Sequence, residues 1–276
     1  MTLIIQKPTG SKLSLAKEFT VQDYMWNFPQ QYGLWSPAEI TTALWLDAAD
    51  ASTITESGGA VSQWDDKSGN ARNAAQATEA NRPTLLANGI GGKPSLQFDG
   101  VDDYLINAAA GLPLGSSARS LFVVYRPLVL TGANSVVSQG EFNSTGQWFA
   151  LQFRQTPSGD PYFAGFNADL SSGDAITLDS KIAGVTYNGT NVILYKNGTL
   201  KSSAARTLNT TGNTFSVGSS PGQAEFANGL IGEIVMTSSV LSTLDRQRVE
   251  SYLAHKWGLT ANLPADHPYK TVGPTP

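Results

Sequence analysis

The sequence predicts an all-β fold: an antiparallel two-sheet β-sandwich with an extended N-terminal arm and one C-terminal helix. Charged residues make up only 14% of the chain, whereas glycine (27) and proline (14) are frequent. Short strands joined by polar turns have this composition, and helical bundles do not. About a dozen short apolar or alternating segments, separated by turn residues, indicate a sandwich rather than a parallel α/β fold.

Two Asn-Gly pairs mark the clearest of these segments, which runs from Lys181 to Leu200. Asn-Gly favours the type I′ turn, because both central positions of this turn need positive φ. Asn188-Gly189 and Asn197-Gly198 therefore predict a three-strand antiparallel meander joined by two-residue turns. The partners predicted around the first turn are Tyr187 with Thr190, Val185 with Val192, and Ala183 with Leu194.

The remaining elements follow from apolar patterning. Strands are predicted at residues 42–47, 62–66, 94–99, 103–106, 120–125, 134–138, 147–154, 161–166, 214–217 and 230–236. One helix is predicted over 243–257, where Ser242 is the N-cap, Asp245 lies three residues on and Gly258 supplies the C′ position. Its apolar face carries Val249, Tyr252, Leu253 and Trp257. The prolines after residue 259 exclude regular structure in the tail.

Composition excludes several classes of function. The formal net charge is −4 and no basic cluster occurs, so we expect no nucleic-acid partner. The chain has no cysteine, which excludes disulfides, thiolate metal sites and cysteine nucleophiles. No stretch reaches the roughly 18 apolar residues that a membrane helix needs. The first residues do not have the pattern of a signal peptide, so we expect export only by lysis, by another route or as part of a particle.

Residues 1–38 differ from the domain that we expect over 39–276. They combine aromatic and proline residues without helical or strand period, which is too much apolar surface for a solvated tail. Two alternatives remain open: the segment packs on its own domain, or it docks on another protein chain. We favour docking, with Trp26, Phe28, Tyr32 and Trp35 as the assembly and anchoring residues.

Several segments resemble the laminin G-like and concanavalin A-like domains. They are ALWLDAAD (43–50), QWDDKSGNARNA (63–74), PSLQFDGVDDYL (94–105), TNVILYKNG (190–198) and the stretch 226–259, which ends in YLAHKWGL. The resemblance implies a jelly roll that binds sugars, binds proteins or serves as a structural part. The YLAHKWGL ending is similar to proteins of tailed bacteriophages and bacterial surfaces. The IIQKPTGSKL start resembles a short virion attachment arm.

The chain lacks the catalytic signature that this resemblance implies for its enzymes. Glucanases of the superfamily carry Glu-x-Asp-x-x-Glu on a strand, and Glu141, Glu225 and Glu233 have no carboxylate two residues on. The only histidines, His255 and His267, lie far from any candidate serine in the sequence. We therefore expect no enzymatic activity.

Two acidic clusters are candidate calcium sites. Asp99, Asp102 and Asp103 place carboxylates at a strand edge, and Asp66 begins an alternating run of oxygen side chains. Calcium takes six to eight oxygen ligands from loops. The alternative for both clusters is turn chemistry, because Asp and Asn commonly accept hydrogen bonds from nearby backbone N–H groups. Calcium is the only cofactor that the sequence suggests.

Sugar binding needs exposed aromatic rings beside amide and carboxylate groups. The candidates are Trp64, Trp148, Tyr162 and Asn143. The alternative is that these aromatic residues belong to the core, as most do in a β-sandwich.

The leading hypothesis is a non-enzymatic structural protein on the particle surface of a tailed phage, either a capsid decoration or cement protein or part of a tail fibre. Residues 1–38 would anchor it to other virion proteins, and the sandwich would project outward. We expect a homo-oligomer, with a trimer as the first guess, and neither nucleic acid nor membrane as a partner. The alternative is a carbohydrate-binding adhesion module that recognises a host surface glycan.

Overall fold

Antiparallel strands dominate the structure. The computed structural model describes residues 35–276 apart from 109, 143, 221 and 223. In this part of the chain, 17 strands form one hydrogen-bonded sheet. They are β1 (Thr42–Asp47), β2 (Ile54–Ser57), β3 (Ala60–Trp64), β4 (Ala74–Ala75), β5 (Thr84–Leu86), β6 (Ser95–Asp99), β7 (Leu105–Asn107), β8 (Arg119–Pro127), β9 (Ala133–Gly140), β10 (Trp148–Arg154), β11 (Gly159–Ala164), β12 (Leu170–Ser171), β13 (Lys181–Tyr187), β14 (Asn191–Lys196), β15 (Thr199–Ala205), β16 (Phe215–Val217) and β17 (Asn228–Thr237).

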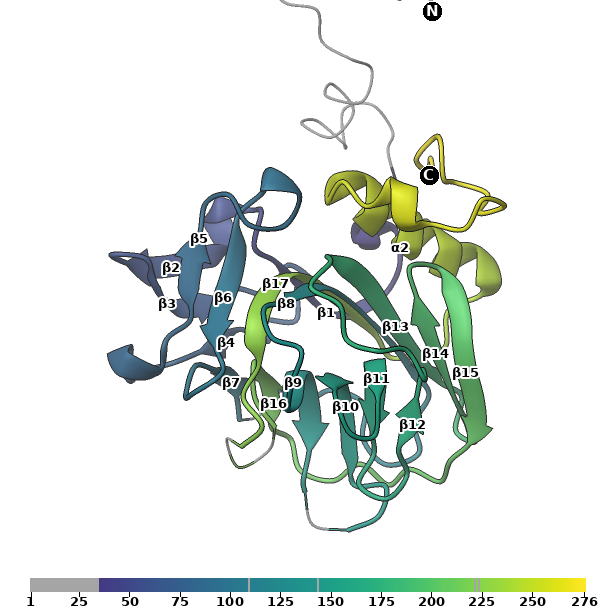
Figure 1. Cartoon of the computed structure of the whole chain (residues 1–276), viewed down its shortest axis with the longest axis horizontal. Helices are drawn as coiled ribbons and strands as arrows, with labels where there is room; N and C mark the ends of the chain where they lie inside the picture. The colour runs from purple at the N-terminus through teal and green to yellow at the C-terminus, as the bar shows by residue number, and fades with distance from the viewer. Residues whose placement is uncertain (1–34, 109, 143, 221, 223) are drawn as a thin grey trace, which may run out of the picture. The chain divides into compact units, whose positions relative to one another are not determined.

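Strand β17 organises the sheet. It pairs with β8 along most of its length, and with β6 and then β1 along its other edge. From β8 the sheet continues through β13, β14 and β15. On the other side, β7, β16, β9, β10, β11 and β12 lie in order, and the short strands β2–β5 link them back to β6 (Figure 1). The sheet is thus nearly closed and barrel-like, and the predicted two-sheet jelly roll is not confirmed.

The central meander is confirmed, but the register of its first hairpin was wrong. Lys196 pairs with Thr199, and Asn197 and Gly198 have φ of 50° and 79°, as a type I′ turn requires. In the first hairpin, Tyr187 pairs with Val192 instead of Thr190, a shift of two residues. The remaining predicted partners shift equally: Val185 pairs with Leu194 and Ala183 with Lys196.

The side chain of Asn188 explains this shift. Its Oδ1 accepts the backbone N–H groups of Thr190 and Asn191 at 3.0 and 2.7 Å, and the Asn188 N–H donates to the Asn191 carbonyl at 3.3 Å. The turn is therefore centred on Gly189 and Thr190 instead of Asn188 and Gly189. Because side chains alternate with period two, the shift leaves the same residues facing the core. Val185, Val192 and Leu194 are all fully buried.

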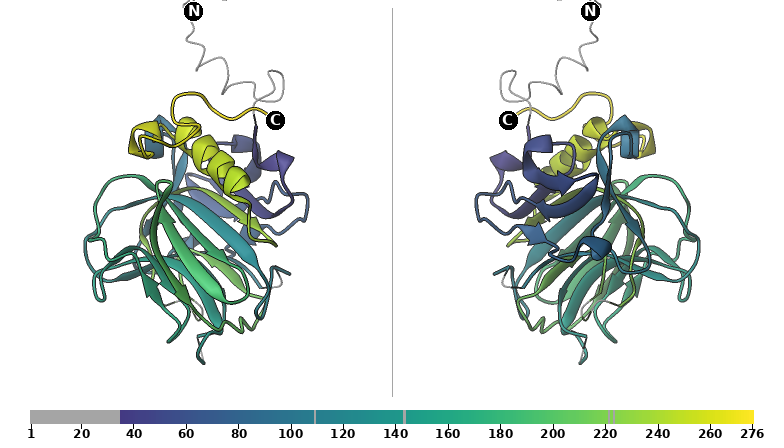
Figure 2. Two further views of the ribbon diagram at one scale, coloured as in Figure 1. Left: turned by 90° about the vertical axis from the view of Figure 1, so that its right-hand side faces the viewer. Right: turned by 90° about the vertical axis from the view of Figure 1, so that its left-hand side faces the viewer.

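One helix, α2 (Thr243–Lys256), lies near the C-terminus (Figure 2). Ser242 caps it, because the Ser242 hydroxyl accepts the Asp245 N–H at 3.1 Å. Trp257 follows the helix and packs over Gly232 of β17, where a Cβ atom would lie 2.8 Å from the indole ring. Short 3-10 turns complete the described structure: Pro37–Glu39, Ala51–Thr53, Glu79–Asn81, Ile90–Gly92 and Thr260–Asn262. Within the described residues, no helix is long and apolar enough to cross a membrane.

The predicted arm falls almost wholly outside the described residues. This holds for Trp26, Phe28 and Tyr32, and their docking role stays a prediction. Trp35 is described. The residue is 1% exposed, and its ring lies edge-on to Tyr252 of α2 at 6.2 Å. Its backbone N–H donates to the Pro274 carbonyl. At this position the chain packs on its own domain, which was the alternative to docking.

Candidate functional site

An aromatic corner stands out on the outer side of β10 and β11. We define it as Phe142, Trp148 and Phe166. Alternate residues of β10 face opposite ways: Phe149, Leu151 and Phe153 join the main core, whereas Trp148 and Ala150 form a separate cluster with Tyr162 and Ala164 of β11. Phe142 packs edge-on against Trp148 at 5.0 Å and against Phe166 at 4.7 Å, and it is 48% exposed.

Two loops hold the aromatic corner together. The Gly146 N–H donates to the carbonyls of Gly165 and Phe166 at 2.8 and 3.0 Å, so the loop after β9 is tied to the loop after β11. Phe166 and Asn167 both have positive φ, at 49° and 60°, which non-glycine residues adopt rarely. Strained backbone of this kind clusters at binding sites.

The indole N–H of Trp148 is buried and has no hydrogen-bond partner among the described residues. An unsatisfied buried donor costs about 1–3 kcal/mol, so such groups in native proteins call for an explanation. Trp148 is only 1% exposed, and Phe142 packs edge-on against its ring. The aromatic corner therefore presents one exposed ring at the surface, and the unpartnered indole N–H of Trp148 lies buried in the same cluster.

Tyr162 lies at the other end of this cluster. Its hydroxyl donates to Asp169 at 3.0 Å, and the guanidinium of Arg154 lies 5.3 Å from its ring centre. Burial, together with Asp169, raises the pKa of Tyr162 to about 12, so the phenol stays protonated. The structure thus brings together two of the predicted sugar-binding residues, Trp148 and Tyr162, and both are buried.

The other two candidates lie elsewhere. Trp64 is fully buried in the main core, where it cannot stack on a sugar in this conformation. Asn143 lies outside the described residues. Since alternation alone does not reveal which face loops will cover, the sequence could not separate Trp64 from Trp148. Phe142 and Phe166 were not predicted as site residues, because neither belongs to a binding motif and Phe166 ends the predicted strand 161–166.

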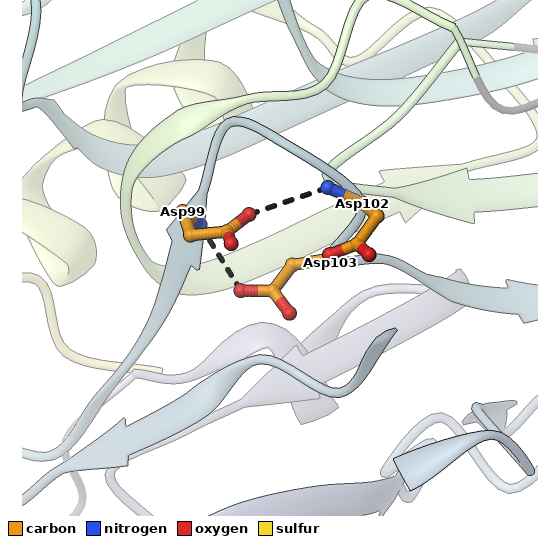
Figure 3. A group of neighbouring side chains, drawn as sticks. All are labelled: Asp99, Asp102 and Asp103. Atoms are coloured by element: carbon orange, nitrogen blue, oxygen red, sulfur yellow. Dashed lines mark hydrogen bonds between the residues drawn. The ribbon is translucent and has the colours of Figure 1, made fainter. Parts of the chain in front are cut away.

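The acidic triad Asp99, Asp102 and Asp103 forms a second candidate site, at the turn between β6 and β7 (Figure 3). Carboxylate oxygens from the three residues lie within 4.8 Å of one another. Gly100 makes this turn possible with φ of 81°, and it lies so close to Asn228 that a Cβ atom would meet that side chain at 2.7 Å. The Asn228 amide also donates to the Asp99 carbonyl at 2.8 Å.

Part of this triad is used in turn chemistry. Asp99 Oδ1 accepts the N–H groups of Val101 and Asp102 at 2.8 and 3.3 Å, and Asp103 Oδ2 accepts the Asp99 N–H at 3.0 Å. The remaining carboxylate oxygens accept no hydrogen bond from the described residues. Burial, and then the charge of Asp99, raises the pKa of Asp103 to about 6. A hard divalent cation would relieve this repulsion, so the donor set fits calcium once water or carbonyl ligands complete the shell.

The run that begins at Asp66 is explained by turn chemistry. Its carboxylate accepts the backbone N–H groups of Trp45, Ser68 and Arg72 at 2.9, 2.9 and 3.0 Å. Asp66 therefore ties its loop to β1, and its oxygens are taken up by protein donors. This was the alternative to calcium binding for that cluster.

Glu233 of β17 is a fully buried carboxylate. It lies beneath α2 and accepts the indole N–H groups of Trp45 and Trp257, both at 2.7 Å, and the Tyr252 hydroxyl at 3.0 Å. Lys256 pairs with it at 2.8 Å. This carboxylate anchors the helix to β17 and cannot reach a polymeric substrate.

Comparison with known proteins gives one family match. The family model described as the concanavalin A-like lectin/glucanases superfamily matches residues 98–245, more than half of the chain. No curated protein matches the sequence.

Similar solved structures include enzymes and binding domains. A GH54 α-L-arabinofuranosidase soaked with 4-nitrophenyl α-L-arabinofuranoside has a TM-score of 0.62 and 15% identity, over 80% of this chain and 60% of that one. Domain 4 of AbnA, a GH43 extracellular arabinanase from Geobacillus stearothermophilus, was solved with arabinotriose; it has a TM-score of 0.54 and 14% identity, over 74% of this chain and 95% of that one.

The binding domain of botulinum neurotoxin serotype D, solved with N-acetylneuraminic acid, has a TM-score of 0.51 and 19% identity, over 78% of this chain and 52% of that one. The chain thus spans about 60% of the arabinofuranosidase and half of the toxin domain. At these identities the likeness concerns the fold.

Proposed function

The chain belongs to the concanavalin A-like lectin/glucanases superfamily, and from this premise we propose that it is a non-enzymatic glycan-binding protein whose binding site is the aromatic corner. The observation that carries the proposal is the exposed Phe142 ring packed on Trp148, whose buried indole N–H has no partner among the described residues and becomes available to a ligand when the Phe142 loop moves aside. A sugar ring stacks its apolar face on an aromatic side chain and offers hydroxyl acceptors to a nearby donor.

The similar structures support this class of ligand. All three were solved with a carbohydrate or glycoside: 4-nitrophenyl α-L-arabinofuranoside, arabinotriose and N-acetylneuraminic acid. The fold is also shared with glycoside hydrolases, which need a pair of accessible carboxylates roughly 5–10 Å apart across a substrate groove. Glu233 is buried under α2. Asp169 already accepts hydrogen bonds from the Tyr162 hydroxyl at 3.0 Å and from the Gly165 N–H at 2.8 Å. We therefore place binding, not hydrolysis, at this site.

The test is glycan-array binding of the full chain, followed by affinity measurement on the best arabinose- or sialic-acid-containing ligand. Phe142→Ala removes the exposed ring and should weaken binding about tenfold or more. Trp148→Phe keeps an aromatic ring, removes the indole N–H together with part of the bicyclic ring, and should weaken binding several-fold. Leu130→Ala, at a residue that is 51% exposed, is the matched control and should bind as the wild type does. Equal affinity of all variants would contradict the proposal, and release of reducing sugar would contradict its non-enzymatic part.

Calcium is a further part of the proposal. Asp99, Asp102 and Asp103 would hold the ion, which would neutralise their mutual repulsion and stiffen the turn after β6. The accessible oxygens of Asp102 and Asp99 could accept it without unfolding the turn. Calcium titration by calorimetry, with Asp102→Asn as the variant that loses binding, tests this assignment.

We propose that the protein carries this site on the surface of a tailed-phage particle, either in a decoration of the capsid or in a fibre. The resemblance of the YLAHKWGL ending and the aromatic, proline-rich composition of residues 1–38 support this role. Because Trp35 packs on Tyr252, the test is deletion of residues 1–34. A truncated chain that still folds but no longer enters particles, or no longer forms the oligomer, supports the proposal; unchanged incorporation contradicts it.

A further inference from the structure

A small pocket lies at the start of β1, apart from the aromatic corner and the acidic triad. It is half open to solvent, has a volume of about 290 Å³ and is lined by Ala38, Ile40, Thr41, Thr42, Trp45, Lys67, Ser68 and Asn70. Ligand pockets typically range from roughly 300 to 1,000 Å³, so this volume suits a small ligand of one or two rings. The lining combines one aromatic ring with polar side chains from a loop.

Two of these side chains are held rigidly from below. The Trp45 indole N–H donates to the buried Glu233 at 2.7 Å. The Lys67 ammonium pairs with Asp47 at 3.0 Å and with Asp50 at 2.7 Å, and it lies 4.6 Å from the centre of the Trp45 ring. Side chains that are already fixed lose little conformational entropy when a ligand binds.

The polar atoms left over in the pocket are complementary to a sugar. Lys67 has three N–H donors, and the two carboxylates use two of them, which leaves one. Asn70 donates its amide N–H groups to the Thr42 carbonyl at 3.1 Å and to the Ser68 hydroxyl at 2.8 Å, and its Oδ1 accepts nothing from the described residues. Lys67 and Asn70 both line the pocket, so it offers one donor and one acceptor, which suits neighbouring hydroxyl groups because each hydroxyl both donates and accepts.

Charge decides between neutral and acidic sugars. Asp47 and Asp50 flank Lys67, and although burial opposes the Lys67 charge, the two carboxylates raise the pKa of Lys67 and keep it protonated. Asp47 also pairs with Lys256 at 2.6 Å, and Lys256 pairs with Glu233 at 2.8 Å. The two lysines thus face three carboxylates, so Lys67 offers a hydrogen bond without a net attraction for anions.

We propose that this pocket is a second saccharide subsite, which takes one neutral sugar ring through a pair of adjacent hydroxyl groups, with Trp45, Lys67 and Asn70 as the contact residues. The proposal rests on the proposed glycan-binding function but concerns a different place. Together, two subsites would raise the avidity for a branched or multivalent glycan without any increase in single-site affinity.

The experiment follows the indole signals of the full chain labelled with [15N]tryptophan, because the chain has six tryptophans and Trp45 lies in the pocket. L-Arabinose and D-galactose are titrated into the millimolar range expected of a single small contact site. The Trp45 signal, identified with Trp45→Phe, should shift with either sugar. It should stay in place with tetrahydropyran-2-methanol, which has the ring but no adjacent pair of hydroxyls.

Filling the pocket gives the decisive variant. Ala38 is exposed and lines the pocket, so the phenylalanine ring of Ala38→Phe should fill it and raise the Kd of both sugars about tenfold. Alanine makes no side-chain hydrogen bond, so none is lost in this variant. Ala80→Phe places the same substitution at an exposed position of another 3-10 turn and should leave the titration unchanged. The proposal is overturned if the Trp45 signal does not shift with either sugar, or if the Ala38→Phe variant binds the sugars as the wild type does.

The two proposals fail separately. Array binding that depends on Phe142, combined with a static Trp45 signal, overturns the second subsite and leaves the proposed function standing. A Trp45 shift that Ala38→Phe abolishes, without any effect of Phe142→Ala on glycan binding, supports the subsite and overturns the role of the aromatic corner.

Discussion

Gly218 lies directly after β16, where the packing leaves no room for a side chain. Its φ is 83°, and a Cβ atom there would lie 2.2 Å from Phe98 in the main core. We expect Gly218→Ala to reduce the free energy of unfolding by about 2–4 kcal/mol, because backbone strain and a core clash add together. Chemical denaturation measures the loss. Gly173→Ala is the matched control: φ is 77° but nothing lies within 4 Å, so only the smaller backbone cost, about 1 kcal/mol, should appear.

Asp103 makes stability depend on pH. Its folded pKa, about 6, lies above the usual 3.8 because of burial and the neighbouring Asp99. The unfolded chain therefore loses this proton first as pH rises. The stability that the group contributes is complete below about pH 4 and is lost as pH rises through 6. In chelator, we expect the wild type to lose about 1–3 kcal/mol relative to Asp103→Asn between pH 4 and pH 7. An equal pH profile for both proteins would contradict this assignment.

Residue-level chemistry was only partly visible in the sequence. The spacing of Asp99, Asp102 and Asp103 was sufficient to predict that their carboxylates meet, because a tight turn brings them together. The sequence could not distinguish the roles of Trp64 and Trp148, since both belong to strands. Trp64 faces the main core, whereas Trp148 faces a separate, smaller cluster. Only the loop that places Phe142 over Trp148 makes one of them a candidate.

At the scale of elements, helix α2 depends on one buried carboxylate. Glu233 of β17 accepts hydrogen bonds from Trp45, Tyr252 and Trp257 and pairs with Lys256. We expect Glu233→Gln to cost about 2–4 kcal/mol, because the amide cannot accept from all of these donors and Lys256 loses a buried counter-charge. Thermal and chemical denaturation are the measurements.

Glu79→Gln, at an exposed position of a 3-10 turn, should change stability by less than about 0.5 kcal/mol and serves as the control. An unchanged unfolding free energy for Glu233→Gln would show that helix packing does not depend on this carboxylate.

The elements themselves were mostly predictable. Alternation located β6 and β10 to within a residue, and Ser242 and Gly258 marked the ends of α2 correctly. The first hairpin was misaligned because the Asn188 side chain accepts the Thr190 and Asn191 N–H groups and centres the turn on Gly189 and Thr190, and local propensity does not rank the two turn positions. The two-residue strands β4 and β12 were missed, since they form only where a neighbouring strand edge is available.

At the scale of the whole molecule, calcium should couple the turn after β6 to global stability. A cation that binds only the folded state stabilises it by about 2.7 kcal/mol at 100 times its Kd. We therefore expect Tm to rise with calcium concentration and to fall back in chelator. Asp102→Asn should abolish the rise, and magnesium should reproduce it poorly because it needs a smaller, octahedral shell. A Tm that is independent of calcium would exclude the site.

The sequence by itself determined the all-β class, the places of most strands, the type I′ turn at Asn197-Gly198 and the C-terminal helix, because these depend on local periodicity and turn chemistry. The tertiary structure decided how the sheet curls, which side chains its loops cover, and how Trp45 and Lys67 come to line one pocket. Those features depend on contacts between residues far apart in the chain, such as Trp45 with Glu233, and no local pattern encodes them.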